Sequence, residues 1–394
     1  MAAASDKARF FLEQSVPELK EYERKGIFSA QEITSIARKR SDFEHKINAR
    51  GSTPADFARY AEFEMNVDAL RRKRVKRLGI KSTAHNGKRR IFFVFDRGTR
   101  KHPGDIGLWM EAIDFARKQK AYKKLQEMLT HVLRLHPTKA DLWIHAAQYA
   151  MEENGDITEA RSYMQRGLRF CKGSRAMWLE YARLEMSYVA KIHLRREVLG
   201  ITTRDADQPG QAHPGDADEN LLRLPRLTAM DISLNSENDD VDTSALQKLE
   251  STPALSGAIP VAIFDAAMAQ FLDPKFGLDF FKMLLEYDDI PACRKVADHV
   301  TALLLKEYPQ SWSSHACHVQ LPLVSIRPTS ADFPSALRDM LVRLKEARRK
   351  SNSPELIGWA KGSLEKILQT SDLDPAIRTV ADSVIKSLGV PEPT

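Results

Sequence analysis

The chain has little cysteine, and the three residues it has lie far apart. Cys171, Cys293 and Cys317 are odd in number and widely spaced, a pattern that argues against a disulfide framework and favours a reducing intracellular compartment. Long apolar runs are also missing: no stretch approaches the roughly 18 residues of a membrane-spanning helix, and no basic-then-apolar signal peptide is visible. We therefore expect no contact with a membrane.

The sequence also lacks the common catalytic and metal-binding motifs. It has no glycine-rich phosphate loop, no Cys-x-x-Cys pair and no His-Glu-x-x-His segment. His315, Cys317 and His318 are close together, but a fourth ligand at zinc spacing is absent, so we interpret them as packing residues of a helix. We expect no enzymatic activity, no cofactor, no metal and no small-molecule substrate.

What the chain does contain is a repeat. Trp109, Trp143 and Trp178 are 34 and 35 residues apart, and each begins a similar segment. This interval has room for two helices and two turns, and self-similarity at this period is typical of stacked helical hairpins. An aromatic residue at a fixed phase of such a repeat has a core to fill. The residues that we predict to pack inside the repeats are Phe57, Tyr60, Trp109, Phe115, Trp143, Tyr149, Trp178 and Tyr181.

Acidic residues recur on the first helix of each hairpin, where paired carboxylates could suggest acid–base catalysis. Their phase favours ion pairs with arginines of the second helices, which would hold neighbouring hairpins in register. Such pairs, if exposed, contribute about 0 to 1 kcal/mol each. The acids are Glu62, Glu64, Glu180 and Glu185, and the arginines are Arg97, Arg161 and Arg166.

The repeat resembles the half-a-tetratricopeptide (HAT) repeat. The residues that carry the resemblance are Trp178, Tyr181, Leu184 and Glu185 in a first helix, and Ala160, Arg161, Tyr163, Arg166 and Leu168 in a second. The resemblance implies an all-α fold, a right-handed α-solenoid of HAT or tetratricopeptide-like hairpins. It also implies a scaffold role, because HAT repeats occur mostly in proteins that assemble RNA-processing machines.

Charge divides the chain unevenly. The formal net charge is +7, but residues 201–260 carry eleven acidic against four basic residues, which leaves the remainder at +14. A body this basic favours a polyanionic neighbour, with nucleic acid the usual candidate. The acidic segment is poor in apolar residues and predicts a flexible insertion. We divide the chain into an amino-terminal helical region at 1–90, HAT repeats at 91–200, the insertion at 201–260 and degenerate helical repeats at 261–394.

Capping signals place several helices. Gly26 predicts the end of a helix over residues 17–25, Ser29 with Glu32 predicts a capping box that starts a helix reaching residue 48, and Pro54 after Thr53 predicts a third start. Further helices are predicted over residues 188–197, 260–272, 276–287, 291–308, 311–321 and 332–349, with later starts at Ser353 and Asp374.

The first helices should form a cap for the solenoid. A cap needs a polar outer face, which we expect from Lys39, Arg40, Glu44 and Lys46, while Phe43 should point inward as the edge of an amphipathic stripe. Phe43, Lys39 and Arg40 are also our candidates for docking to a partner.

A basic stretch between residues 70 and 90 extends the spacing to Trp109 and contains ten Lys and Arg without one acid. Three interpretations stay open: a solvated helix face, a nuclear-localisation signal, and contact with RNA phosphates. Base stacking is disfavoured because no aromatic residue lies among the cations. The candidates for RNA contact or nuclear localisation are Arg71, Arg72, Lys73, Arg74, Lys76, Arg77, Lys88, Arg89 and Arg90.

The first 80 residues resemble the amino-terminal region of the small-nucleolar-RNA-associated protein six family. The segments that carry this resemblance are Val16–Leu19, Lys25–Phe28, Glu32–Ile33, Arg38–Arg40, Asp42–Glu44, Asp56–Phe57, Tyr60, Glu62–Glu64, Leu70–Arg74 and Lys76–Gly79. The resemblance implies a non-catalytic scaffold in the B subcomplex of the small-subunit processome, in the nucleus and nucleolus. Its implied partners are β-propeller subunits, with pre-rRNA and small nucleolar RNA in the assembly, and its implied role is processing to 18S rRNA.

Two other functions remain open from the residues alone. The repeats equally fit a HAT scaffold of mRNA splicing or 3′-end processing. The basic body also fits a stand-alone RNA-binding protein.

The acidic insertion generates the first prediction. Replacing residues 205–256 with a short Gly/Ser linker should leave the melting temperature nearly unchanged, because the segment lacks the apolar residues needed to join a core. Limited proteolysis of the intact protein should cut within this segment first. A large fall in the melting temperature on replacement would show that the segment is part of the folded structure.

Overall fold

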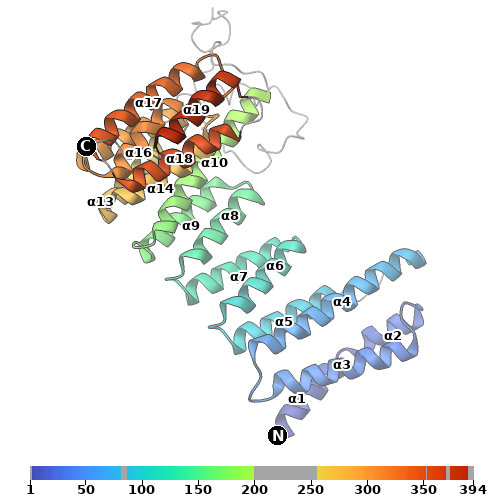
Figure 1. Cartoon of the computed structure of the whole chain (residues 1–394). Coiled ribbons are helices and arrows are strands. Elements are labelled where there is room, and N and C mark those ends of the chain that lie inside the picture. The colour runs from blue at the N-terminus through green and yellow to red at the C-terminus, as the bar shows by residue number, and fades with distance from the viewer. Residues whose placement is uncertain (1, 81–86, 199–254, 352, 370–372, 389–394) are drawn as a thin grey trace, which may run out of the picture. The chain divides into compact units, whose positions relative to one another are not determined.

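The computed structural model describes residues 2–80, 87–198, 255–351, 353–369 and 373–388. Within these ranges every regular element is a helix, which confirms the all-α fold of helical hairpins (Figure 1). None of the described helices is both long and apolar enough to cross a bilayer. Most of the predicted acidic insertion lies outside the described residues.

The chain forms two compact units, Met1–Pro137 and Thr138–Thr394. Unit 1 contains α1 (Ala2–Glu13), α2 (Val16–Arg24), α3 (Ala30–Asn48), α4 (Pro54–Leu78), α5 (Gly87–Lys101), α6 (Ile106–Lys118) and α7 (Tyr122–Leu135). Unit 2 contains α8 (Ala140–Glu152), α9 (Ile157–Phe170), α10 (Arg175–Val198), α13 (Ala258–Phe271), α14 (Pro274–Leu284), α15 (Pro291–Glu307), α16 (Trp312–Gln320), α17 (Phe333–Lys350), α18 (Pro354–Leu368) and α19 (Pro375–Leu388), with short 3₁₀ turns η3 (Leu285–Tyr287) and η4 (Leu321–Leu323).

The predicted helix signals of unit 1 act as expected. Gly26 ends α2 in the left-handed conformation, with φ of 63°, which glycine adopts at no steric cost. Ser29 and Glu32 form the reciprocal capping box at the start of α3. The Asp56 carboxylate accepts hydrogen bonds from the N–H and hydroxyl of Thr53 before α4. Sequence reasoning missed α1, which packs against α3.

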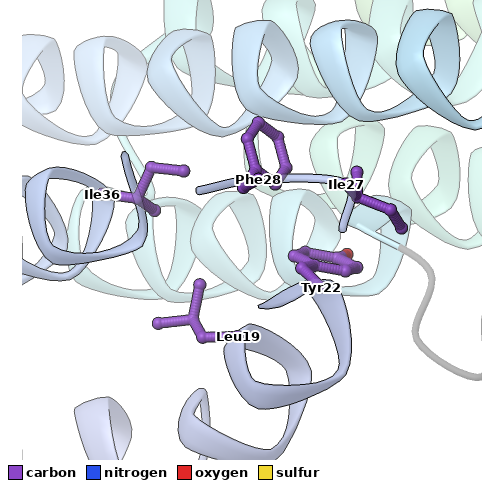
Figure 2. Packing of buried hydrophobic residues seen from close by; sticks show 5 residues of the cluster. All are labelled: Leu19, Tyr22, Ile27, Phe28 and Ile36. Carbon is purple, nitrogen blue, oxygen red and sulfur yellow. The ribbon is translucent and has the colours of Figure 1, made fainter. Parts of the chain in front are cut away.

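The amino-terminal end of unit 1 has a small apolar core of its own. Figure 2 shows its five buried residues, Leu19, Tyr22, Ile27, Phe28 and Ile36, which come from α2, the following turn and α3. Side chains of α4, Phe63, Val67 and Val75 among them, pack against this cluster. α2 and α3 are therefore joined to α4, where the repeats start, by a continuous core.

Arg74 of α4 closes the edge of this core. Its guanidinium donates to both carboxylate oxygens of Glu32, at 2.6 and 2.7 Å, and to the Ile27 carbonyl. It also lies 4.9 Å from the centre of the Phe28 ring. The hydrogen bonds from Arg74, followed by the one from the Ser29 N–H, lower the pKa of Glu32 to about 2. The pair therefore stays charged well below neutral pH.

Most of the predicted repeat-packing residues are buried. Phe57, Tyr60, Trp109, Phe115, Trp143 and Tyr181 are less than a tenth exposed, and Tyr149 and Trp178 are half-buried. Two of the tryptophans also make an equivalent hydrogen bond: the Trp109 indole donates to the carbonyl of Pro103, and the Trp178 indole to that of Lys172, six residues upstream in each case. The indole thus secures the turn that precedes its own helix.

Two glycines mark where helices of one hairpin cross closely. A methyl group on Gly98 of α5 would lie 2.8 Å from Leu108 Cδ2 and 3.0 Å from Phe57 Cγ. Gly167 of α9 occupies the same position in its hairpin, where a methyl group would lie 2.9 Å from Trp143 Cβ. At these two crossings glycine leaves room for the aromatic residue of the first helix.

In unit 2, α10 links the first repeats to the later helices. It is continuous over the predicted 188–197 helix, and it contacts both α13 and α14. The Ser187 hydroxyl lies 2.6 Å from that of Tyr287, and Arg175 pairs with Asp273 at 2.6 Å. The helices on either side of residues 199–254 therefore pack directly against one another.

The later helices of unit 2 begin close to their predicted starts, and the Ser353 hydroxyl caps α18 by accepting from the Leu356 N–H. His315 and Cys317 are buried within α16, and burial holds the pKa of the Cys317 thiol above its usual range. In the described residues no group of three or more His, Cys, Asp and Glu side chains could hold a metal ion.

The helix crossing at Gly98 generates the second prediction. Gly98→Ala should lower the free energy of unfolding by about 1 to 2 kcal/mol, because overpacking outweighs the better helix propensity of alanine. The matched control is Gly358→Ala in α18, where no atom lies within 4 Å of the added methyl group. It should raise stability by up to about 1 kcal/mol in the same denaturant titration. Equal gains for both variants would contradict the close crossing.

Candidate functional site

Unit 1 has a groove of about 570 Å³ beside the first helices of two successive hairpins. One wall comes from the amino-terminal half of α4 and the other from α6 and the turn before it, with Phe95 of α5 between them. The lining residues are Pro54, Ala55, Ala58, Arg59, Glu62, Met65, Phe95, Asp105, Gly107, Leu108, Glu111, Asp114, Phe115 and Lys118. The groove is thus built from the repeats themselves.

The bottom and the rim of the groove differ in chemistry. Phe95, Leu108 and Phe115 are buried apolar residues. The polar lining comprises four carboxylates, Glu62, Asp105, Glu111 and Asp114, against two cations, Arg59 and Lys118. Asp105 caps α6 by accepting from the Leu108 N–H at 2.7 Å. The other three carboxylates make no ion pair with any side chain of the described residues.

Glu111 is the groove carboxylate whose proton affinity is raised. Partial burial in the groove raises the pKa of Glu111, and repulsion from Asp105 and Glu62 adds to this effect. A cation placed among them would relieve this repulsion. An apolar floor below a rim with four carboxylates and two cations can therefore bind a segment that carries both apolar and basic side chains.

A buried ion network lies behind this site and involves one of the predicted docking residues. Arg40 of α3 is 1% exposed, and its guanidinium makes two hydrogen bonds to Glu64 of α4, at 2.7 and 2.8 Å. It also reaches Glu18 of α2 at 3.4 Å, and Arg90 of α5 pairs with the same Glu18 carboxylate. The Tyr22 hydroxyl donates to Glu18 at 2.7 Å. Four helices thus meet around these charges.

Burial and pairing shift these pKa values in different directions. Burial opposes ionisation of Glu18, but Arg40 and Arg90 together hold its pKa below the ordinary value. Burial raises the pKa of Glu64, and Arg40 opposes that shift without cancelling it. The carboxylates Glu18 and Glu64 raise the pKa of Arg40 against the effect of its burial. Arg40 therefore stays positively charged within the network.

The structure corrects the expected outer face of the cap. Arg40 and Glu44 were expected to face solvent, but both are 1% exposed. Glu44 accepts two hydrogen bonds from Arg97 of α5, at 2.9 and 3.0 Å. Arg40 is therefore not available for docking, because its side chain is fully used inside the protein.

The other two docking candidates lie at the surface or just below it. Phe43 points inward as expected and stacks on Tyr60, with ring centres 5.1 Å apart and planes 9° apart. Lys39 is exposed, and its ammonium lies 5.7 Å from the centre of the Phe63 ring. Only Lys39 thus offers a charge to a partner.

The expected ion pairs between first and second helices form in one case only. Arg161 of α9 makes two hydrogen bonds of 2.7 Å to Glu185 of α10. Arg97 instead pairs with Glu44, and Glu64 with Arg40. Arg166 donates to the Ser162 carbonyl within its own helix, and Glu180 pairs with Arg183, three residues away.

The basic stretch divides into internal and external cations. Six of its nine candidates belong to α4 and three to α5. Arg71 is buried and pairs with Asp68 at 2.8 Å, and Arg74 and Arg90 make the contacts described above. Lys88 is half-buried, and Arg72 pairs with Asp68 at 2.9 Å. Lys73, Lys76, Arg77 and Arg89 are exposed.

Sequence reasoning missed the groove residues, although the repeat contains a signal for them. Glu62 and Asp114 each stand five residues after the aromatic that begins the motif, Phe57 or Trp109. Residues at one phase of stacked helices lie on one face of the stack. Comparing this repeat position between successive hairpins would have predicted that Glu62 and Asp114 lie on the same face of the stack.

Comparisons with known proteins match part of this chain to one protein family. Residues 12–94 match the model of a family described as U3 small nucleolar RNA-associated protein 6. A Schizosaccharomyces pombe protein of that name is 32% identical over 60% of this chain and 50% of its own length. A human homologue is 32% identical over 50% of this chain and 34% of its own length.

A Dictyostelium discoideum homologue is 25% identical over 89% of this chain and 54% of its own length. The chain therefore spans between about a third and about half of the length of these relatives. The matched family region, residues 12–94, contains Glu18, Arg40, Glu64 and Arg90 of the buried ion network.

The ion network generates the third prediction. Arg40→Ala should lower the free energy of unfolding by about 3 to 5 kcal/mol, because it leaves the buried Glu64 carboxylate without a compensating charge. The control, Lys39→Ala, removes an exposed cation next to it and should change stability by less than about 0.5 kcal/mol.

The pH dependence separates a lost charge pair from lost packing. Without Arg40, the pKa of Glu64 rises further above its unfolded value, so the folded state takes up a proton that the unfolded state does not bind. The Arg40→Ala deficit should therefore shrink as the pH falls from about 7 to about 5. A deficit that does not depend on pH would assign the loss to packing alone.

Proposed function

We propose that the chain is a non-catalytic scaffold subunit of the nucleolar small-subunit processome, because residues 12–94 match the U3 small nucleolar RNA-associated protein 6 family and a relative of that name is 32% identical. In this role it supports pre-rRNA processing to 18S rRNA and assembly of the small ribosomal subunit. Its partners would be other processome subunits, among them β-propeller proteins of the same subcomplex, with pre-rRNA and small nucleolar RNA in the assembly. The observation that carries this proposal is the match of residues 12–94 to the family model, because these residues contain the buried ion network of unit 1.

The groove of unit 1 supplies the proposed docking site. A scaffold works by holding segments of its partners, and stacked hairpins offer a continuous surface for an extended or helical segment. The apolar floor at Phe95, Leu108 and Phe115 would bury apolar side chains of that segment. The carboxylates of Glu62 and Glu111 would pair with its lysines or arginines.

Charge complementarity favours a basic segment over an acidic one. An acidic segment would bring like charges into a partly desolvated groove, which opposes binding. A basic segment gains ion pairs and lowers the repulsion that raises the pKa of Glu111. The groove therefore favours a partner segment with positive charge over one with negative charge.

The fourth prediction tests the groove in cells whose own copy of the protein has been depleted. Glu62→Lys with Glu111→Lys should weaken association with the processome at least about tenfold, which corresponds to about 1.4 kcal/mol. Co-sedimentation with processome particles and the level of mature 18S rRNA are the measurements. The purified variant should melt at the same temperature as the parent, since both side chains are exposed.

The matched control is Glu23→Lys with Asp42→Lys, two exposed acids of unit 1 outside the groove. It makes the same change in net charge and should restore 18S rRNA fully. Equal activity of both double variants would remove the groove from the proposal. A parent chain that does not associate with the processome at all would contradict the scaffold function itself.

A further inference from the structure

Four cations of the basic stretch are without an ion-pair partner among the described residues of unit 1. Lys73, Lys76 and Arg77 of α4 and Arg89 of α5 are exposed, and none of them makes an ion pair or side-chain hydrogen bond with the described residues. Their neighbours Arg71, Arg74 and Arg90 are held by Asp68, Glu32 and Glu18. Some cations of this stretch therefore form ion pairs inside unit 1, whereas these four form none with the described residues.

The three free cations of α4 share one side of the helix. The intervening Arg74 and Val75 are turned toward the core. No acidic residue occurs between residues 69 and 79, so no carboxylate from this half of α4 compensates the charge. Lys73 and Arg77 are four residues apart, a spacing at which like charges repel each other on a helix. A face of this kind carries an electrostatic cost that a polyanion would remove.

Helix-end electrostatics explain only part of this arrangement. Lys76 and Arg77 lie in the last turn of α4, where cations stabilise the negative end of a helix. Arg89 lies in the first turn of α5, which contains no acid, and there a cation opposes the positive end of the helix. Arg89 is thus in a position that the fold alone does not favour.

The start of α5 lies beside the basic half of α4. A methyl group on Gly87 would be 2.7 Å from Asp68 Oδ1, so the two helices touch at this point. Asp68 is itself 2% exposed and already paired with Arg71 and Arg72. The Asp68 carboxylate is therefore occupied and does not neutralise the free cations.

We propose that Lys73, Lys76 and Arg77 of α4, together with Arg89 of α5, form a surface that binds the phosphate backbone of RNA. Phosphates repeat along a strand, so a row of cations on one helix face can engage several at once. No aromatic residue occurs from residue 69 to residue 79, so this part of the surface lacks rings for base stacking. Binding is accordingly independent of base sequence and sensitive to salt.

This proposal does not depend on the groove or on the scaffold function, and the fifth prediction tests it on the purified full chain. The probe is a fluorescein-labelled RNA hairpin with a single-stranded tail, titrated at several salt concentrations. Lys73→Gln with Lys76→Gln and Arg77→Gln should weaken binding about tenfold or more at about 100 mM salt. The slope of log affinity against log salt concentration should become shallower by about 2 to 3, which corresponds to three lost phosphate contacts.

A matched triple variant controls for net charge. Lys345→Gln with Arg349→Gln and Lys350→Gln removes three exposed cations from the carboxyl-terminal end of α17. It has the same change in charge at the same kind of helix end and should leave affinity and slope unchanged. Equal losses for both triple variants would show a net-charge effect only, and an unchanged slope for the α4 variant would show that the RNA lies elsewhere. Either result overturns the proposal.

A single substitution keeps the test valid if the α4 triple variant is unstable. Arg89→Gln removes a cation from the unfavourable end of α5, so it should not lower the melting temperature. It should still make the salt slope shallower by about 0.7 to 0.9. A normal slope in a folded Arg89→Gln protein would exclude Arg89 from the surface.

Discussion

The bidentate pair between Arg40 and Glu64 is the constraint on which the amino-terminal unit depends. A charge buried in this way is costly unless its partner is held in the correct geometry, and the planar guanidinium fixes direction as well as distance. Because Arg40 also reaches Glu18, which Arg90 shares, α2, α3, α4 and α5 must adopt one arrangement to satisfy all of these groups. The network therefore sets the position of α4, and α4 forms one wall of the acidic groove.

The same constraint separates arginine from lysine within the basic stretch. Arg71, Arg74 and Arg90 point into the protein, where the guanidinium can make several directed hydrogen bonds to a carboxylate. Lys73 and Lys76 point outward, where a compact and strongly hydrated ammonium is stable. A count of basic residues does not separate these two tasks. The exposed charge of the stretch is therefore smaller than its composition indicates, and it is concentrated on one side of α4.

The helices could be predicted from the sequence because local chemistry determines where they begin and end. Ser29 with Glu32, Pro54 and Ser353 each act within one turn of the helix that they start. The burial of Arg40 could also be predicted in part, since Ile36, Arg40 and Ile47 share the buried phase of α3. The charged run around Arg40 suggested a solvated face instead. The helical periodicity of α3 alone shows that the Arg40 side chain points into the protein. Its pairing with Glu64 depends on how α3 packs against α4, which the periodicity does not show.

The groove could not be predicted in the same way, because its walls come from residues about 50 positions apart in the chain. Glu62 and Glu111 are ordinary helix residues when each is considered alone, and exposed carboxylates are common on solenoid surfaces. They become a site only when α4 and α6 are placed side by side over Phe95. Close helix approach, such as that at Gly98, determines this placement. A glycine within a helical pattern does not by itself indicate such an approach, because it can equally mark a kink or a helix end.

α4 joins the two proposed surfaces in one rigid element. Its first half carries Glu62 to the groove, and its second half carries Lys73 and Lys76 to the free basic face. Acids toward the start and cations toward the end of a helix both match the helix dipole, so this division also stabilises α4 itself. At about 1.5 Å per residue, Glu62 and Lys76 are roughly 20 Å apart along the axis. A basic protein segment and an RNA backbone would each be attracted by one end of α4 and repelled by the other. One helix would then fix both the order and the spacing of its two partners, which is a task that a flexible linker with the same charges could not perform.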